Sequence, residues 1–126
     1  MTDLTPEIPA GRQLIQGYGE GHFRIGGVLH QGSVIVLAER TLSWPVATLA
    51  EVTLESLDAV THARPGVEIL LIGCGRQPAP LKSPLRNALK KIGIGLELMD
   101  TGAACRTYNV LLSEERRVAA ALIAIR

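Results

Sequence analysis

The stretch Val67-Glu68-Ile69-Leu70-Leu71-Ile72-Gly73-Cys74-Gly75 decides the fold of this chain. It is a nearly continuous apolar run that ends in a small, flexible Gly-Cys-Gly turn. Such a run is typical of a strand that is covered on both faces, as in the centre of a parallel sheet. In open α/β sheets, ligands tend to bind at the loop that leaves such a strand. The stretch therefore indicates both a fold class and a place to look for function.

The composition of the chain fits one globular domain and argues against several other classes. Its 126 residues are 47% hydrophobic and 20% charged, which suffices for a core. A net charge of +1 and only 3% aromatic residues argue against nucleic-acid binding. No segment approaches the roughly 20 apolar residues that cross a bilayer. The N-terminus resembles neither a secretory signal nor a transit peptide, and two cysteines indicate no disulfide framework, so we expect a cytoplasmic protein.

The first half of the chain is dominated by β-like patterns. Residues 1–15 are predicted to be a flexible lead-in, and residues 16–126 a single domain. Residues 22–25 alternate polar and apolar, residues 33–37 are β-branched, and the glycines between them predict a hairpin that joins the two. A third extended piece is expected to begin at Trp44, at an edge of the sheet because Pro45 cannot donate a hydrogen bond.

The second half alternates between helix and strand patterns. The helix after the proline-rich loop is the clearest, since Ser83 suits its N-cap, Pro84 its first turn and Gly93 its end. The predicted order is helix 53–63, strand 67–72, a helix from Ser83, strand 94–99, helix 102–112, a short helix from Ser113 and strand 122–125. This alternation favours an α/β domain whose partly parallel sheet is flanked by helices.

A family resemblance becomes visible when the motifs are taken in order. They are the glycine-flanked Phe23 region, Gly32-Ser33, Trp44, the run ending Gly73-Cys74-Gly75, and the block from Met99 to Arg117 with its Thr-x-x-Ala-x-x-Thr-Tyr-Asn pattern. The chain resembles, over about residues 16–125, a family of small α/β domains of largely unknown function. That family includes the mitochondrial NADH dehydrogenase (complex I) assembly factor 3 and an adipogenesis-associated protein.

The resemblance implies a three-layer fold around a mixed five-stranded sheet, and it implies no established enzymatic activity. The mitochondrial relative assists the assembly of a respiratory complex through protein contacts. We therefore expect a non-enzymatic binding or assembly module with a protein partner, without a cofactor, that supports respiratory-complex or membrane-protein biogenesis. A weak homodimer is compatible with the sequence, although no residue argues for it.

The first candidate ligand-binding segment is Gly73-Cys74-Gly75-Arg76. Its glycines let the backbone approach a ligand, successive N–H groups can form an anion-binding nest, and Arg76 adds charge. However, Pro78 stands where a dinucleotide fingerprint needs its third glycine, and the Walker lysine-serine pattern is absent. The alternative interpretation is a tight strand exit without a ligand.

The second candidate segment contains Thr101, Arg106, Tyr108 and Asn109. Thr101 is expected to cap a helix. Asparagine is a poor residue inside a helix, so Asn109 indicates a specific hydrogen bond, either to a neighbouring loop or to a ligand. Arg106 suits an ion pair with Asp100 or Glu115, or an anion. If strands 67–72 and 94–99 are parallel, both segments face one crevice, where a small molecule or anion could bind.

No catalytic or metal site is predicted. The next helix after Cys74 begins only near Ser83, and no sequence pattern pairs this thiol with a histidine. Cys105 lies inside a predicted helix, so burial is the default for both cysteines. The three histidines lack the spacing of metal ligands. Two hypotheses remain open: an assembly module, and a small-molecule or anion-binding domain with possible enzymatic activity.

Overall fold

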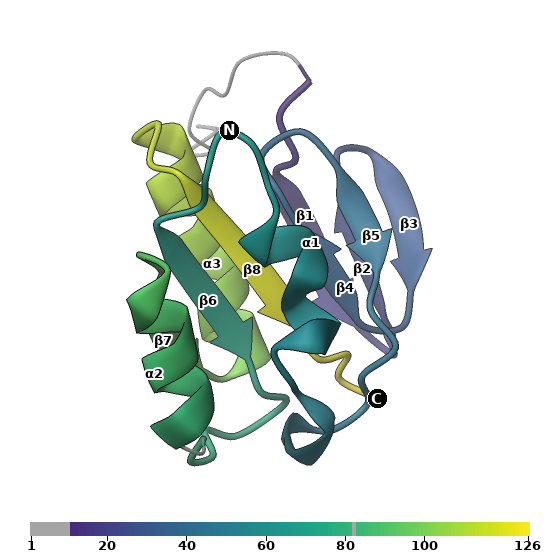
Figure 1. Ribbon diagram of the computed structural model, residues 1–126. Helices are drawn as coiled ribbons and strands as arrows, with labels where there is room; N and C mark the ends of the chain where they lie inside the picture. Colours follow the sequence, from purple (N-terminus) through teal and green to yellow (C-terminus); the bar gives the residue numbers. More distant parts are fainter. Residues whose placement is uncertain (1–10, 82) are drawn as a thin grey trace.

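A mixed five-stranded sheet forms the centre of the protein in the computed structural model, which describes residues 11–81 and 83–126 (Figure 1). Its strand order is β5-β4-β8-β6-β7. Strand β6 runs parallel to both of its neighbours, whereas β4 runs antiparallel to β8 and β5. The expected mixed five-stranded sheet is thus confirmed. Its strands are β4 (Val34–Val36), β5 (Thr41–Ser43), β6 (Ile69–Gly73), β7 (Gly95–Met99) and β8 (Val118–Leu122).

A second, three-stranded antiparallel sheet corrects the prediction for the N-terminal half. It consists of β1 (Ile15–Gly19), β2 (His22–Ile25) and β3 (Val28–Gln31). The predicted hairpin between residues 22–25 and 33–37 is wrong, because β2 pairs with β3 and β1. Gly26 and Gly27, with φ of 57° and 82°, turn the chain within two residues, a conformation that glycine adopts without strain.

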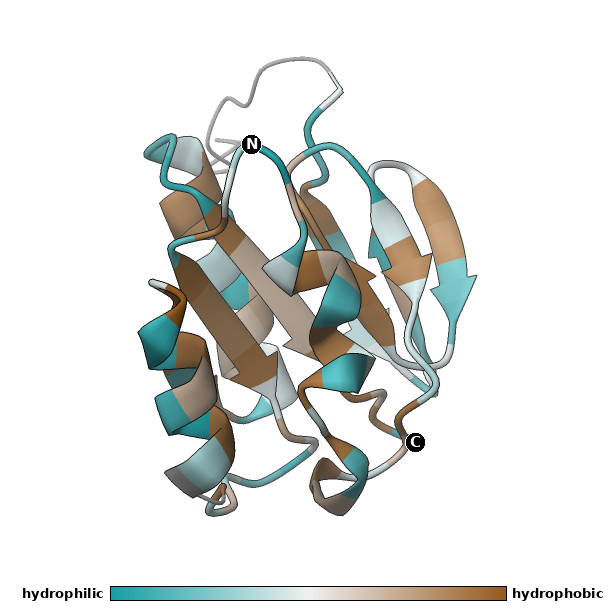
Figure 2. Ribbon diagram, in the orientation of Figure 1, coloured by the Kyte–Doolittle hydropathy of each residue, from teal (hydrophilic) through white to brown (hydrophobic). Residues whose placement is uncertain are grey.

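The five-stranded sheet is covered on both faces, which gives the three expected layers. Helices α1 (Asp58–Thr61) and α2 (Ser83–Lys91) cover one face, and α3 (Thr101–Ser113) with the three-stranded sheet covers the other (Figure 1). Strand β6 therefore alternates between two cores: Leu70 and Ile72 belong to one, and Leu71 to the other. In Figure 2 this strand is brown along its length, as a strand with two buried faces should be.

The middle strand of the sheet is β8, which pairs directly with β6. Its sequence is Val-Ala-Ala-Ala-Leu, and every residue is buried. The alanine side chains occupy little space on either face, so helices can approach the sheet closely there. The expected strand at residues 122–125 shares only Leu122 with β8, and the short helix expected from Ser113 is wrong, because the chain turns directly from α3 into β8.

Helix α3 ends in a Schellman motif that the sequence did not signal. The Arg116 N–H donates to the Leu111 carbonyl at 3.0 Å, and the Glu115 N–H donates to the Leu112 carbonyl at 3.0 Å. The residue with positive φ is Glu115 (60°), a position where glycine is usual. Without a glycine to mark the end, the acidic residues suggested a new helix where the chain in fact turns into β8.

Two further predictions are adjusted. The helix at residues 53–63 is a 3-10 turn, η2 (Glu55–Leu57), followed by α1, and another 3-10 turn, η1 (Leu49–Glu51), precedes both. The prediction that a third extended piece begins at Trp44 is wrong, because the edge strand is β5, which ends at Ser43. Helix α2 starts at Ser83, but the cap expected from the Ser83 side chain lies outside the described part. Of the predicted lead-in, residues 1–10 also lie outside it, and Ile15 belongs to β1.

Candidate functional site

The carboxyl ends of β6, β7 and β8 lie side by side, because these three strands are parallel. The Gly73–Arg76 segment leaves β6 at this edge, and α3 begins there directly after β7. The two candidate segments, which the sequence analysis placed at one crevice, therefore lie next to each other at this edge. How they meet depends on one side chain, that of Thr101.

Thr101 ties three segments together and is fully buried. Its hydroxyl donates to the Ile123 carbonyl, just past β8, at 2.8 Å and accepts from the Gly75 N–H at 2.9 Å. Its own N–H donates to the Gly75 carbonyl at 2.8 Å. These bonds join the ends of β6 and β8 to the start of α3. The two facing segments are thus bonded to each other along this line.

Gly73 allows this close approach. A Cβ atom at Gly73 would lie 2.9 Å from the Thr101 Cα, closer than real Cβ atoms come to other atoms, and 3.0 Å from the Leu122 Cδ2. Gly73 is therefore needed for helix–sheet packing. Cys74 continues the contact, since its N–H donates to the Met99 carbonyl at 2.9 Å.

The predicted cap of α3 is corrected by one residue. Asp100 is the N-cap, and its carboxylate accepts from the Ala103 N–H at 2.8 Å. Thr101 is the first helical residue, so its hydroxyl is available for the sheet. Aspartate and threonine both suit an N-cap, so the sequence alone could not separate their roles.

The two arginines of the candidate site lie on the surface. The Arg76 guanidinium donates to the Arg126 backbone carbonyl at 2.6 Å. Arg106 donates to the Tyr18 hydroxyl at 3.3 Å. That hydroxyl lies so close to Gly102 that a Cβ there would collide with it. Within the described residues, Arg106 forms neither of the two ion pairs considered from the sequence.

Tyr108 and Asn109 lie farther along α3 and hold other parts of the fold. The Asn109 side chain donates to the Ile15 carbonyl at 2.8 Å and accepts from the Ile15 N–H at 2.9 Å, as a neighbouring strand would. The buried Tyr108 hydroxyl donates to the Leu37 carbonyl at 3.3 Å, and burial raises the pKa of this phenol. Asn109 makes a specific hydrogen bond, as its position in a helix had indicated, and the bond anchors β1.

We expect the substitution Asn109→Asp to destabilise the protein by about 2 kcal/mol, because it removes the donor to Ile15 and places a charge beside a half-buried carbonyl. Chemical denaturation monitored by circular dichroism would measure this. Asn87→Asp, at an exposed position of α2, is the matched control and should change stability little. Equal losses in both variants would contradict the anchoring role.

The two cysteines differ in environment. Cys105 is 2% exposed, and burial raises the pKa of its thiol to about 12, so it stays protonated at neutral pH. Cys74 is half-buried, and its thiol donates to the Gln77 carbonyl at 3.2 Å.

We expect an aromatic disulfide reagent to modify Cys74 first in the native protein and Cys105 only on unfolding. The variant Cys74→Ser should then show almost no native reaction; a fast remaining reaction would contradict this prediction.

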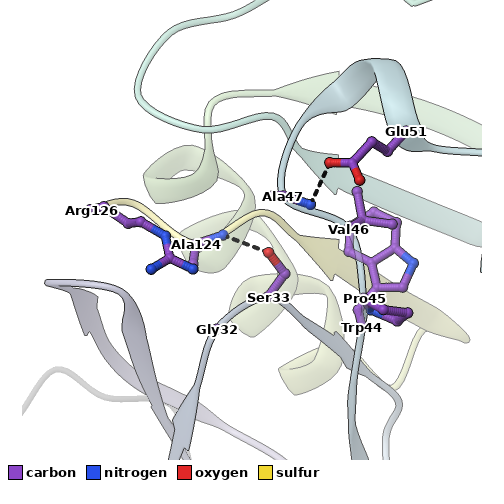
Figure 3. A pocket seen from close by; sticks show the side chains of 9 residues that line it. All are labelled: Gly32, Ser33, Trp44, Pro45, Val46, Ala47, Glu51, Ala124 and Arg126. Atoms are coloured by element: carbon purple, nitrogen blue, oxygen red, sulfur yellow. Dashed lines mark hydrogen bonds between the residues drawn. The ribbon is translucent and has the colours of Figure 1, made fainter.

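A hollow of about 230 Å³ lies beside the candidate segments at the same edge of the sheet (Figure 3). It opens between the segment after β8, the start of β4 and the segment after β5. The Ser33 hydroxyl accepts from the Ala124 N–H at 3.0 Å, and the Glu51 carboxylate accepts from the Ala47 N–H at 3.0 Å. The sequence reasoning missed this hollow, although it had singled out Gly32-Ser33 and Trp44, which line it.

The candidate residues thus divide into groups that the fold keeps apart. Gly73, Cys74, Gly75 and Thr101 meet, Arg76 reaches the Arg126 carbonyl, and Tyr108 and Asn109 contact different segments. Ligand binding by these residues stays a prediction, and each observed contact serves the fold. Among residues 11–81 and 83–126, no group of three or more His, Cys, Asp or Glu side chains could hold a metal ion.

Comparison with known proteins places this fold in a family. A family model described as a protein of unknown function (DUF498/DUF598) matches residues 15–123. This range begins with β1 and ends at Ile123, whose carbonyl accepts the hydrogen bond from Thr101. The chain belongs to this family. An uncharacterized protein of Rhodobacter capsulatus is 40% identical over 122 residues, which are 95% of this chain and 93% of that protein.

The curated relatives of this chain include proteins named as assembly factors. The NADH dehydrogenase [ubiquinone] 1 alpha subcomplex assembly factor 3 of Danio rerio is 37% identical over 120 residues, covering 95% of this chain and 68% of that protein. A crystal structure described as an outer membrane protein from Bartonella henselae superposes with a TM-score of 0.84 at 38% identity, covering 92% of this chain and 98% of that one. In the described part of the present chain, no helix has the length and apolar character needed to cross a membrane.

Proposed function

We propose that this protein is a non-enzymatic module that binds a protein partner and supports the assembly of a respiratory complex from the cytoplasmic side. The observation that carries the proposal is the 37% identity with the Danio rerio NADH dehydrogenase assembly factor, which extends over 95% of this chain. The match covers nearly all of this chain and 68% of that protein, which supports a shared assembly role.

The geometry of the candidate site supports a role in binding rather than in chemistry. The hydroxyl of Thr101, the amide of Asn109 and the hydroxyl of Tyr108 are engaged with backbone atoms of this chain. These groups hold β1, β6, β8 and α3 in fixed relation. A rigid scaffold of this kind suits the presentation of a surface to a partner.

Strand β3 supplies one feature of such a surface. It lies at the edge of the three-stranded sheet and leaves Val28 57% and Leu29 46% exposed. Edge strands with exposed apolar side chains are rarely left bare in soluble proteins, and added strands from partners are a common way to cover them.

The proposal is tested by deleting the gene in its host and separating the membrane complexes on a native gel stained for NADH oxidation. We expect the deletion to lower the amount of fully assembled NADH dehydrogenase, and the intact gene to restore it. Normal assembly in the deletion strain, together with no protein partner recovered by the tagged chain, would contradict the proposal.

A further inference from the structure

A second cavity, of about 280 Å³, lies at the opposite edge of the sheet from the candidate site. It is found where β6 and β8 begin and β4 ends, beside the segment that follows α1. Its lining is rich in arginine, and we call it the arginine pocket. The arginines that line it are Arg12, Arg40, Arg64, Arg116 and Arg117.

Only some of these guanidinium groups have an anionic partner. Arg116 and Arg117 share the Glu68 carboxylate, at 3.5 Å and 3.1 Å, and hydrogen bonding to Arg117 is the main cause that lowers the pKa of Glu68. The ion pairs of the described residues include neither Arg12, Arg40 nor Arg64. The pocket therefore keeps positive charge that this part of the chain does not neutralise.

The rest of the pocket lining includes an apolar part. Leu37 and Val118 are buried there, and Val67 and Pro65 complete an aliphatic wall. An occupant that uses the whole pocket therefore needs an anionic group for the arginines and an aliphatic group for this wall. Its volume is near the lower end of small-ligand sites, and it can hold a few side chains.

We propose that the arginine pocket binds an acidic segment of a partner polypeptide, with a carboxylate at the arginines and an aliphatic side chain against Val67 and Val118. The inference rests on the proposed function, for which it names the chemistry of the partner. Guanidinium groups bind carboxylates through paired, charge-assisted hydrogen bonds, and arginine is enriched at protein interfaces.

The lining favours a carboxylate over a phosphate. Glu39 and Glu115 also line the pocket and would repel a doubly charged phosphate more strongly than a singly charged carboxylate. Phosphate sites usually add backbone N–H groups from glycine-rich turns. None of the described lining residues is a glycine.

The test uses fluorescence polarization with the full chain and a labelled peptide of alternating aspartate and leucine. We expect binding that weakens as salt is added, and an affinity about tenfold lower in the double variant Arg40→Gln, Arg64→Gln. The matched control is Arg24→Gln with Lys91→Gln, which removes the same charge from exposed positions outside the pocket and should bind as the unaltered chain does. Circular dichroism would confirm that all three proteins are folded.

Several results would overturn the arginine-pocket proposal. They are equal binding of a peptide with asparagine in place of aspartate, equal losses in the two double variants, tighter binding of inorganic phosphate than of the peptide, or no peptide binding at all. The native-gel assay separates this failure from that of the proposed function. If the Arg40→Gln, Arg64→Gln gene restores NADH dehydrogenase assembly fully, the pocket is not the docking site, while the assembly role stands. If deleting the gene leaves assembly normal, the assembly role fails whatever the peptide does.

Discussion

Replacing Thr101 by valine should destabilise the protein by about 3 kcal/mol, although the side chain keeps its size. The substitution removes the hydroxyl that donates to the Ile123 carbonyl and accepts from the Gly75 N–H. Since Thr101 and Ile123 are buried, the Ile123 carbonyl gains no water in exchange, and a buried polar group without a partner costs about 1–3 kcal/mol. Urea denaturation followed by circular dichroism would measure the loss.

Thr107→Val is the matched control for this experiment. It makes the same chemical change in the same helix, at a half-buried position whose hydroxyl makes no hydrogen bond within the described residues. The control should change the free energy of unfolding by less than about 1 kcal/mol. If Thr101→Val were as mild as Thr107→Val, the connection between β6, β8 and α3 would contribute little to stability.

The second large effect is expected for Gly73→Ala, at about 3 kcal/mol. The added methyl group would lie 2.9 Å from the Thr101 Cα, so the start of α3 has to move away from the sheet. Overpacking of a core costs about 1–3 kcal/mol, and a contact with backbone belongs at the upper end because no side-chain rotation relieves it. The displacement should also lengthen the Thr101–Gly75 hydrogen bonds.

Gly95→Ala gives the comparison for Gly73→Ala. Gly95 lies in the neighbouring strand β7, where a Cβ would have its nearest contact at an ordinary 3.7 Å from the Glu68 carbonyl. Thermal unfolding should show a lowered midpoint for Gly73→Ala and a nearly unchanged one for Gly95→Ala. Because Gly73 and Thr101 touch, the double variant Gly73→Ala, Thr101→Val should lose less than the sum of the single losses. Additive losses would show that the two positions act independently.

Local patterns were sufficient for one buried strand and the two main helices in the second half of the fold. The apolar run before Gly73 predicted β6, Pro84 and Gly93 placed α2, and Asp100-Thr101 placed the start of α3. Each of these signals depends on residues that are close in sequence, where side-chain periodicity and capping act directly. The parallel neighbours β6 and β7 followed from the strand–helix–strand order.

Local sequence patterns did not determine which strands pair, or where a helix ends when no glycine follows it. The pairing of β2 with β3 depended on which glycines turn the chain, and both glycine-containing segments after β2 were suitable. The end of α3 depended on Glu115, which adopts a positive φ that its residue type does not announce. Tertiary packing imposes this conformation, since the chain must return from α3 to β8.

The sequence by itself determined the α/β class, the buried strand β6 and the two main helices, because these follow from apolar spacing and capping within a few residues. Only the tertiary structure decided that the Gly-Cys-Gly turn is a packing contact with Thr101 and that Asn109 serves as a partner for β1. It also brought arginines from four places in the chain around one pocket. Such groupings depend on which distant segments meet, and no pattern of neighbouring residues encodes that.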